Sequence, residues 1–273
     1  FFSSRRRHTR SFHVTGVQTC ALPILPWLDG LRVQIVPGNE MSRALYLSGL
    51  YEPTVAVVIQ RLLPAGGTFF DVGANMGLFS LLAASWVGAG GQVHAFEPSA
   101  REHARLVEHV RFNGLEGRVR AERVALAEHD GTVGLHVAED SHSGHNTLSD
   151  GFANAAVAEV GVETVEACTL DSYVRRHDVR RIDVVKIDVE GSEGRVLAGA
   201  RETLRTLRPR LVFEVNEPTL RRHGSSPDDL QRSLAEAGYD LWDIDEATAE
   251  LRPLPALARG SSWDVVAAPR GAL

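Results

Sequence analysis

Strand-like and helix-like segments alternate along this 273-residue chain, and the alternation constrains its fold more than any other feature. Short apolar segments at 68–72, 92–96 and 118–124 have the length and composition of buried strands. The segments between them, 77–87 and 99–113, have the apolar pattern of helices packed on a sheet. Strands separated by such helices are typical of a parallel sheet with helices on its faces. The sequence therefore predicts an α/β fold.

The second half of the chain continues this pattern. Strand-like segments recur at 182–187, 210–215, 239–244 and 263–267. Helices are expected between them, one with an apolar stripe that ends at Leu207 and one that starts at Ser226. An S-x-x-E capping box, Ser99 and Glu102, is expected to start the helix after the second strand.

The region from about 130 to 169 interrupts the alternation. Strand-like segments at 132–137 and 162–169 flank the polar, turn-rich stretch AEDSHSGHNTLSDGF. Long polar connections inside a compact domain commonly carry function. We predict an excursion from the sheet that forms a lid over a site.

The first 24 residues differ in composition from the rest, with four arginines and no acid. A targeting peptide would need a clearer apolar core after the arginines, and a basic tail that binds an anionic partner is the other native alternative. Because VTGVQTCALPI resembles translated sequencing-adaptor sequence, we expect 1–24 to be non-native sequence or a disordered leader. An N-terminal extension is expected at 25–64, with a helix opened by Glu52 and Pro53, and the main domain at 65–270.

Overall composition limits the partners and the compartment. The net charge of −6, from 29 basic and 35 acidic residues, weighs against a nucleic-acid partner. Two cysteines cannot build a disulfide framework, which favours a reducing, cytoplasmic location. No run of 18 apolar residues is present, so no membrane partner is expected. The expected partner is a small-molecule or glycan acceptor.

Four predicted strands end in, or just before, an acid: Asp71, Glu97, Asp188 and Glu214. Ligands of parallel sheets bind at the carboxyl ends of the strands, which share one edge. We therefore predict that these acids line a binding site.

The loop after the first of these strands, Gly73-Ala-Asn-Met-Gly77, indicates the kind of ligand. It lacks both the G-x-G-x-x-G pattern of dinucleotide folds and a P-loop lysine, and Asp71 would repel a phosphate. The glycines admit close approach of a ligand, and amides at the helix start suit a carboxylate. With Asp71 for an ammonium group and Glu97 for ribose hydroxyls, the loop matches S-adenosylmethionine.

Six successive motifs resemble those of FkbM-type methyltransferases: FDVGANMGLFSLLAA, VHAFEPSAREHARLVEHVRFNGL, VALAEHDGTVGLHV, TLDSY, DVVKIDVEGSEGRVLAGARETL and LVFEVN. They follow one another over about residues 68–216. The resemblance implies a class I methyltransferase fold, Rossmann-like, whose seven-stranded, mostly parallel sheet has an antiparallel last strand. It also implies methyl transfer from S-adenosylmethionine, typically to a hydroxyl of a sugar or secondary metabolite.

The resemblance also assigns roles by position. Asp71, Gly73, Asn75 and Gly77 would hold the methionine part of the cofactor, and Glu97 the ribose. Val124 and Ala125 would flank the adenine. Asp188 and Glu190 would face the methionine amine and the acceptor pocket.

A hydroxyl acceptor also needs a base to remove its proton. Asp188 is the first choice, because it ends the strand nearest the expected methyl position. Further candidates are Glu190, His145, Glu214 and His142. Each has a structural alternative: Glu190 could cap the next helix, Glu214 could pair with an arginine, and the two loop histidines could be solvated.

Metal dependence and other functions remain as alternatives. Asp188, Glu190 and Glu214 are ligand types that magnesium accepts, but the usual acid–asparagine pair is not evident, so no metal is predicted. The sequence Asp188-Val-Glu-Gly disfavours transfer to a nucleobase amine, which would call for an N/D-P-P-Y/F loop. A nicotinamide-dependent oxidoreductase and a non-catalytic cofactor-binding domain are the competing functions.

Overall fold

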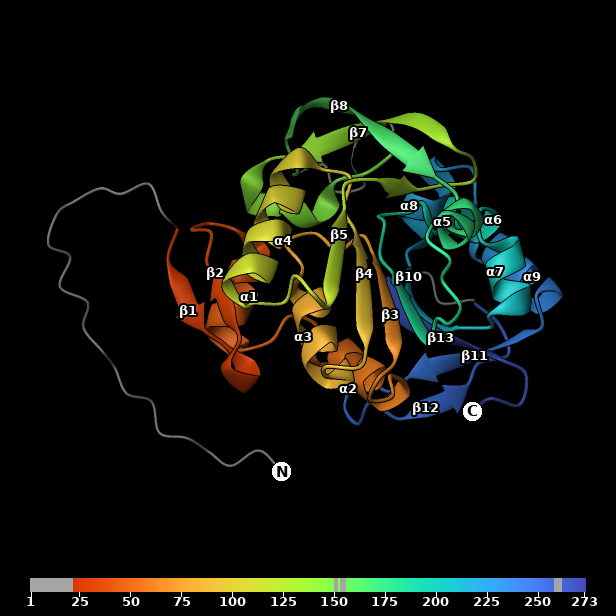
Figure 1. The fold of residues 1–273 in the computed structure, drawn as a ribbon. Helices are drawn as coiled ribbons and strands as arrows, with labels where there is room; N and C mark the ends of the chain where they lie inside the picture. Colours follow the sequence, from red (N-terminus) through yellow and green to blue (C-terminus); the bar gives the residue numbers. More distant parts are fainter. Residues whose placement is uncertain (1–21, 150–151, 153–155, 258–261) are drawn as a thin grey trace, which may run out of the picture.

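The computed structural model describes residues 22–149, 152, 156–257 and 262–273 (Figure 1). The prediction for residues 1–24 therefore lies outside the described residues, apart from 22–24. Within the described ranges, no helix has the length and apolar composition that crossing a bilayer requires.

One large sheet forms the centre of the molecule (Figure 1). Its strands are β3 (Thr68–Val72), β4 (Gln92–Phe96), β5 (Val119–Glu122), β9 (Val184–Ile187), β10 (Arg210–Val215), β11 (Tyr239–Ile244), β12 (Leu251–Pro253) and β13 (Trp263–Pro269). They are arranged in the order β12-β11-β13-β10-β9-β3-β4-β5. The five strands from β10 to β5 are parallel, and β13 is antiparallel to both of its neighbours. The expected seven-stranded sheet with an antiparallel last strand is confirmed, and β12 adds an edge strand that was not predicted.

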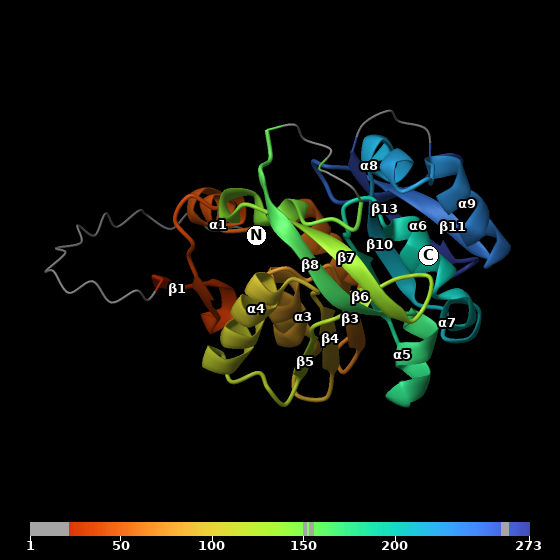
Figure 2. The same ribbon diagram turned by 90° about the horizontal axis from the view of Figure 1, so that it is seen from above.

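Helices cover both faces of this sheet (Figures 1 and 2). The first core contains side chains of α2 (Pro53–Leu62), α3 (Leu78–Val87) and α4 (Ala100–Phe112). The second contains side chains of α5 (Leu170–Arg176), α6 (Glu193–Ala198), α7 (Arg201–Thr206) and α9 (Pro227–Glu236). Consecutive residues of one strand contribute to opposite cores, Phe69 to the first and Phe70 to the second, as the alternation of a strand requires.

A smaller sheet lies across one end of the large one (Figures 1 and 2). Its strands β6 (Ala125–Leu126), β7 (Gly131–Ala138) and β8 (Glu159–Cys168) are arranged in the order β6-β8-β7. Since β6 starts three residues after β5 ends, this sheet stands at the carboxyl ends of the parallel strands. Between β7 and β8 lies the 3₁₀ segment η2 (Asp140–His145), within the stretch predicted to be a lid.

The N-terminal segment adds a small hairpin and a helix beside α4. It comprises β1 (Ile24–Pro26), η1 (Leu28–Gly30), β2 (Arg32–Gln34) and α1 (Glu40–Ser48). Neither α1 nor the short α8 (Glu217–Arg222) was predicted. Asn39 starts α1, because its side-chain oxygen accepts a hydrogen bond from the amide of Ser42.

Two local predictions are wrong. The helix expected to end at Leu207 is divided into α6 and α7, and at the break Gly199 lies so close to Ala127 that a Cβ would stand 2.1 Å from its carbonyl oxygen. The capping box does not form either. Ser99 starts α4, but its hydroxyl has no hydrogen-bond partner among the described residues, and Glu102 pairs with arginines of its own helix instead.

Candidate functional site

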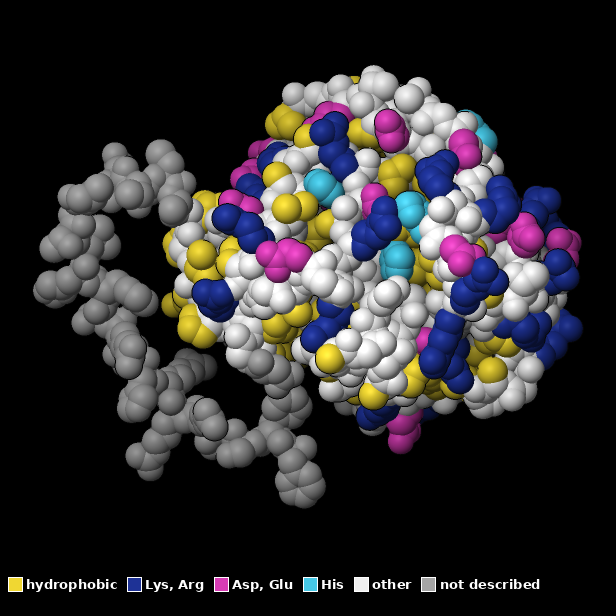
Figure 3. Space-filling view, viewed as in Figure 1, with side chains coloured by type: hydrophobic (Ala, Val, Ile, Leu, Met, Phe, Trp, Pro, Cys, Tyr) yellow, Lys and Arg dark blue, Asp and Glu magenta, His cyan; other side chains and the backbone are white. Residues whose placement is uncertain are grey.

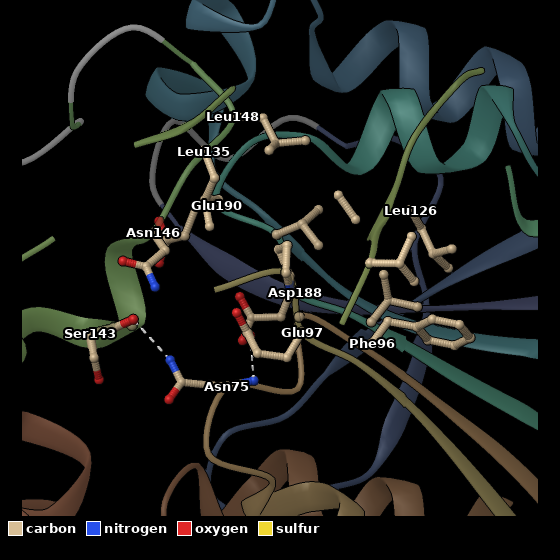
Figure 4. Close-up of a pocket in the computed structure, with 17 residues that line it drawn as sticks. Asn75, Phe96, Glu97, Leu126, Leu135, Ser143, Asn146, Leu148, Asp188 and Glu190 are labelled. Carbon is tan, nitrogen blue, oxygen red and sulfur yellow. Dashed lines mark hydrogen bonds between the residues drawn. The ribbon is translucent and has the colours of Figure 1, made fainter. Parts of the chain in front are cut away.

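A first cavity opens where β3, β4 and β9 end, with about 540 Å³ of open space. Figure 4 shows Glu97 and Asp188 at its centre, with Asn75 beside them. Apolar side chains make up much of the remaining wall: Phe96, Val124, Leu126, Leu135 and Leu148. The cavity therefore has a polar part near the strand ends and an apolar part toward the small sheet.

The loop after β3 forms part of this wall. Gly73 has φ +82°, and a Cβ on it would lie 1.8 Å from the carbonyl oxygen of Asp188, so only glycine fits. Asn75 is also left-handed, with φ +49°. Gly77, by contrast, lines neither this cavity nor the one described below, and a Cβ there would lie 2.3 Å from Leu106. The packing of α3 against α4 therefore explains why residue 77 is a glycine.

Glu97 is held in a fixed position although it is only 5% exposed. One carboxylate oxygen accepts the amide of Asn75 and the other accepts the amide of Ser99, both at 2.8 Å. Burial raises the pKa of Glu97 to about 8, while these backbone donors act in the opposite direction. The site thus contains an anchored carboxylate whose charge changes near neutral pH.

A second cavity, with about 800 Å³ of open space, adjoins the first. The two share Gly73, Asn75, Gly144, Asp188 and Glu190. Six acids line the second cavity: Glu52, Asp71, Asp188, Glu190, Glu214 and Asp264. Of the four acids expected at the sheet edge, three therefore meet here, and Glu97 lines the first cavity.

Lys186 is the buried cation of the second cavity. It is 4% exposed, and its ammonium group donates a 2.7 Å hydrogen bond to Asp188. The same group lies 4.6 Å from the ring centroid of Phe79. Burial opposes the charge, but Asp188 and other nearby carboxylates raise the pKa of Lys186 above its ordinary value. Lys186 is thus paired with an acid, Asp188.

Asp71 is almost fully buried, at 1% exposure. One of its oxygens accepts a 2.6 Å hydrogen bond from the Ser80 hydroxyl, while Oδ1 has no hydrogen-bond partner within the described residues. Burial raises the pKa of Asp71, and Lys186 counteracts this. Asp71 thus retains an unused acceptor in a cavity wall.

Glu190 and His145 form an ion pair between the strand edge and η2. Nδ1 of His145 lies 3.4 Å from a Glu190 oxygen, and Nε2 lies 3.8 Å from Glu40 of α1. The hydrogen bond to Glu190 raises the pKa of His145, and burial raises that of Glu190. Such a pair can exchange a proton near neutral pH.

Glu190 does not cap the following helix. The N-cap of α6 is Ser192, which makes no side-chain capping hydrogen bond among the described residues, and the carboxylate of Glu193 accepts the amides of Val189 and Gly191 in the turn before the helix. Glu190 has φ +50°, and its carbonyl accepts a 3.1 Å hydrogen bond from the Thr147 hydroxyl. Thr147 of the β7–β8 connection therefore holds the left-handed turn at Glu190. The Glu190 carboxylate lies at the wall of both cavities.

Three further carboxylates line the second cavity but not the first. Glu214 of β10 and Asp264 of β13 are cross-strand partners. Burial, together with nearby Asp188, raises the pKa of Glu214 to about 9, and burial raises that of Asp264 to about 6. Glu52 joins them from the N-terminal segment, with a pKa raised to about 7 by burial. Glu214 accepts a hydrogen bond from Ser262, so the alternative in which it pairs with an arginine is not observed.

The segment η2 is attached to both neighbouring parts of the site. The side-chain amide of Asn39 donates to the Asp140 carbonyl at 2.7 Å and to the Ser143 hydroxyl at 2.8 Å. The side-chain amide of Asn75 donates to the Ser143 carbonyl at 2.9 Å (Figure 4). Arg105 of α4 also forms a bidentate pair with Asp140. Helix α1 and the loop after β3 thus hold η2 over both cavities.

The remaining predicted residues divide between these cavities and the outside. Val124 and Ala125 line the first cavity, and His145 the second. His142 lines neither and pairs with Glu139. Sequence reasoning missed the following lining residues of the second cavity: Met41, Tyr51, Glu52 and Asp264. Of these residues, only Glu52 was singled out in the sequence, where it was interpreted as the start of a helix.

In the parts of the chain that the structure describes, no three His, Cys, Asp or Glu side chains are grouped as a metal site would require. Asn216, the nearest candidate for an acid–asparagine pair, accepts the amide of Thr219 as the cap of α8.

The strand order and the position of both cavities define a class I methyltransferase fold. Its parallel strands end at the ligand-binding edge, and its last strand is antiparallel. The sequence model of the family described as "Methyltransferase FkbM domain" matches residues 71–241. This chain belongs to that family, and its methyl donor is S-adenosylmethionine. The oxidoreductase alternative is thereby set aside.

Comparison with solved structures gives distant similarities. An FkbM methyltransferase from Methylobacillus flagellatus KT is 15% identical, with a TM-score of 0.46, and the match covers 74% of this chain and 44% of that one. An S-adenosylmethionine-dependent O-methyltransferase from Thermotoga maritima is also 15% identical, with a TM-score of 0.45 and coverage of 91% and 78%. An O-methyltransferase from Bacillus cereus is 12% identical, with a TM-score of 0.46 and coverage of 84% and 86%. No curated protein matches the sequence.

Proposed function

We propose that this methyltransferase transfers the methyl group to a hydroxyl of a sugar, glycan or secondary metabolite. The observation that carries the proposal is the wall common to the two cavities, which includes Gly73, Asp188 and Glu190. A donor in the first cavity and an acceptor in the second would meet at this wall. The carboxylates of the second cavity are hydrogen-bond acceptors that suit hydroxyl groups and disfavour phosphate-bearing acceptors.

The residues of the first cavity fit the methyl donor. Gly73 has no side chain and lines the cavity with its backbone, which is the surface proposed for the methionine part. Asp71 lines the adjoining second cavity, and its Oδ1, which has no hydrogen-bond partner within the described residues, is the acceptor proposed for the methionine ammonium group. Glu97 is anchored for the ribose, and Val124 and Ala125 stand in the wall proposed for the adenine.

The remaining proposed contacts are less direct. Asn75 would act through its backbone and through its hydrogen bond to η2, and Gly77 through the start of α3. Bound S-adenosylmethionine supplies a methyl group that its sulfonium has already activated, so the chain has to align the acceptor and remove one proton.

Asp188, Glu190 and His145 are the residues proposed to orient the acceptor hydroxyl and to remove its proton. Asp188 shares one oxygen with Lys186, which leaves the other to orient the hydroxyl. The Glu190–His145 pair lies at the same wall, and we assign to it the role of general base.

Incubation with methyl-labelled S-adenosylmethionine and a panel of hydroxylated acceptors tests this function. Mass spectrometry should locate the label on an acceptor oxygen. Label on nitrogen would contradict O-methylation, and cofactor binding without turnover of any acceptor would favour the non-catalytic alternative.

Substitution of the histidine tests the assigned base. We expect His145→Gln to lower kcat by about 10²-fold, the usual contribution of a general base, with cofactor affinity retained. The matched control is His142→Gln in the same segment, outside both cavities. Equal effects of the two substitutions would remove His145 from the mechanism.

A further inference from the structure

A carboxylate from outside the family-matched region reaches the second cavity. Glu52 precedes α2, whereas the family model begins at residue 71. Tyr51 and Met41 of the same N-terminal segment also line this cavity. The segment therefore supplies one wall of the space where the acceptor is proposed to bind.

The backbone of Glu52 is in an unfavourable conformation. Its φ of 45° and ψ of 65° are left-handed, a region that glutamate rarely adopts, and its side chain does not cap the helix that follows. It instead lies near Lys186 and Asp264, and hydrogen bonding from Tyr51 stabilises its charge. The Glu52 side chain thus lies at the cavity wall and does not cap α2.

Glu52, Glu214 and Asp264 together form what we call the acidic triad. Glu214 and Asp264 are direct cross-strand partners, an arrangement in which like charges destabilise a sheet. The triad lines the second cavity but not the first, and each of its members lies within electrostatic reach of Asp188 in the wall that both cavities share.

Among the described residues, this cavity is lined by more acids than basic side chains, which are Lys186 and His145. Of its six acids, Asp188 is paired with Lys186 and Glu190 with His145. Asp71 lies in the wall of the same cavity, and its Oδ1 lacks a hydrogen-bond partner within the described residues although the side chain is only 1% exposed. The methionine ammonium would satisfy Asp71, and the cation near the acidic triad is then Lys186, which is already paired with Asp188.

We propose that the acidic triad binds a protonated amino group of the acceptor, which makes the acceptor an amino sugar or a similar amino alcohol. This inference rests on the proposed function, because it assigns the acceptor to the second cavity. An anionic acceptor would be repelled there, and a neutral one would bring no counter-charge to these three half-buried carboxyl groups. Met41, Leu78 and Phe79 in the same wall provide apolar contact for the carbon skeleton.

A matched set of three probes tests the inference: glucosamine, N-acetylglucosamine and glucose. Their affinities are measured on the protein saturated with S-adenosylhomocysteine, so no turnover is needed. Glucosamine should bind at least about tenfold more tightly than the other two, as expected for a charge-assisted contact. Equal binding, a preference for a neutral probe, or no binding of glucosamine would overturn the inference.

Variants then locate the preference in the triad. Glu52→Gln should remove most of the preference for glucosamine and leave the affinity for glucose within about twofold, since only the charge-assisted contact is lost. Tyr51→Phe, which retains the ring, should reduce the preference less. The control Glu108→Gln makes the same chemical change on the exposed side of α4 and should leave the preference intact. A preference that persists in Glu52→Gln would refute the assignment.

Cofactor calorimetry separates this inference from the proposed function. Failure to bind S-adenosylmethionine would defeat the proposed function itself. Normal cofactor binding without any preference for the amine would defeat only the assignment of the acidic triad.

Discussion

At the scale of single residues, the site depends on close contacts that tolerate little change. Gly73 is the clearest case, because the loop after β3 touches the end of β9 at this residue. The glycine pattern in the sequence suggested close approach of a ligand, whereas the structure shows that the chain itself already comes close. The requirement for glycine is thus partly structural.

Gly73→Ala should therefore be far more damaging than an ordinary substitution of a left-handed glycine. We expect it to lower the free energy of unfolding by about 3 kcal/mol or more and to abolish cofactor binding, because Asp188 must move. Gly49→Ala is the matched control. Gly49 is in the left-handed helical region with φ +81° and has nothing within 4 Å of a Cβ, so a loss of only about 1 kcal/mol is expected. Chemical denaturation of both variants checks the comparison, and similar losses would contradict it.

Glu97 leads to a prediction about pH. Its carboxyl has a pKa of about 8 in the protein without ligand, so it becomes ionised as the pH rises from 7 to 9. Because the ionised form is the better acceptor for ribose hydroxyls, the affinity for S-adenosylmethionine should increase over this range.

Glu97→Gln should weaken binding by about tenfold at pH 9, the loss of one hydrogen bond to a charged group, and should flatten the pH profile. Calorimetry at several pH values measures both effects. An affinity that falls with pH in the wild-type protein would exclude this role for Glu97.

At the scale of secondary-structure elements, η2 connects parts of the chain that are distant in sequence. Asn39 attaches it to α1 and Asn75 attaches it to the loop after β3. The polar composition of the β7–β8 connection indicated an excursion from the sheet, but no local pattern indicates where such a segment is anchored. The role of Asn39 depends on contacts more than 100 residues away.

Asn39→Ser tests whether these contacts hold η2 in place. Serine can still cap α1 but cannot donate to Asp140 and Ser143 as the amide does. We expect faster hydrogen exchange across residues 139–147 and a several-fold loss of cofactor affinity, with α1 protected as before. Asn39→Ala should in addition destabilise α1 by about 1 kcal/mol. Unchanged exchange in the serine variant would show that η2 is held by other contacts, such as Arg105 with Asp140.

At the scale of the whole molecule, the sequence was a good guide to the sheet and a partial guide to the site. Strand ends are encoded locally by apolar runs that meet an acid, and parallel topology then brings Asp71, Asp188 and Glu214 to one cavity. The sequence did not indicate that Glu52 and Asp264 line that cavity, because they reach it from other parts of the chain. The acceptor wall was therefore the least predictable part.

The charge distribution follows from this arrangement. On the face seen in Figure 3, basic side chains gather on the side of α7 and α9, and acidic side chains are interspersed among them. Among the acids of the site, Asp71 and Glu97 are buried and the others are half-buried. The stability of the molecule should accordingly respond to pH through its interior.

We expect the ligand-free protein to become less stable as the pH rises from 7 to 9. Burial raises the pKa of Glu97 to about 8, of Glu193 to about 7 and of Glu214 to about 9, all above their ordinary value of 4.5. In this range the folded protein binds more protons than the unfolded chain, so the free energy of unfolding falls as the pH increases. Buried histidines with lowered pKa values, such as His94, act in the opposite direction only below about pH 6.5, where the unfolded chain binds the extra proton.

Thermal unfolding between pH 7 and 9 measures this dependence. Each extra proton held by the folded state costs about 1.4 kcal/mol per pH unit, and about 1 kcal/mol shifts Tm by 2–4 °C in a protein of this size, so Tm should fall by several degrees. Glu214→Gln should reduce the slope, because the amide does not ionise, whereas Glu108→Gln on the exposed side of α4 should not change it. A Tm that stays constant or rises over this range would mean that the buried acids are already ionised at pH 7. The interior would then hold an uncompensated negative charge that a cationic ligand relieves at all pH values tested.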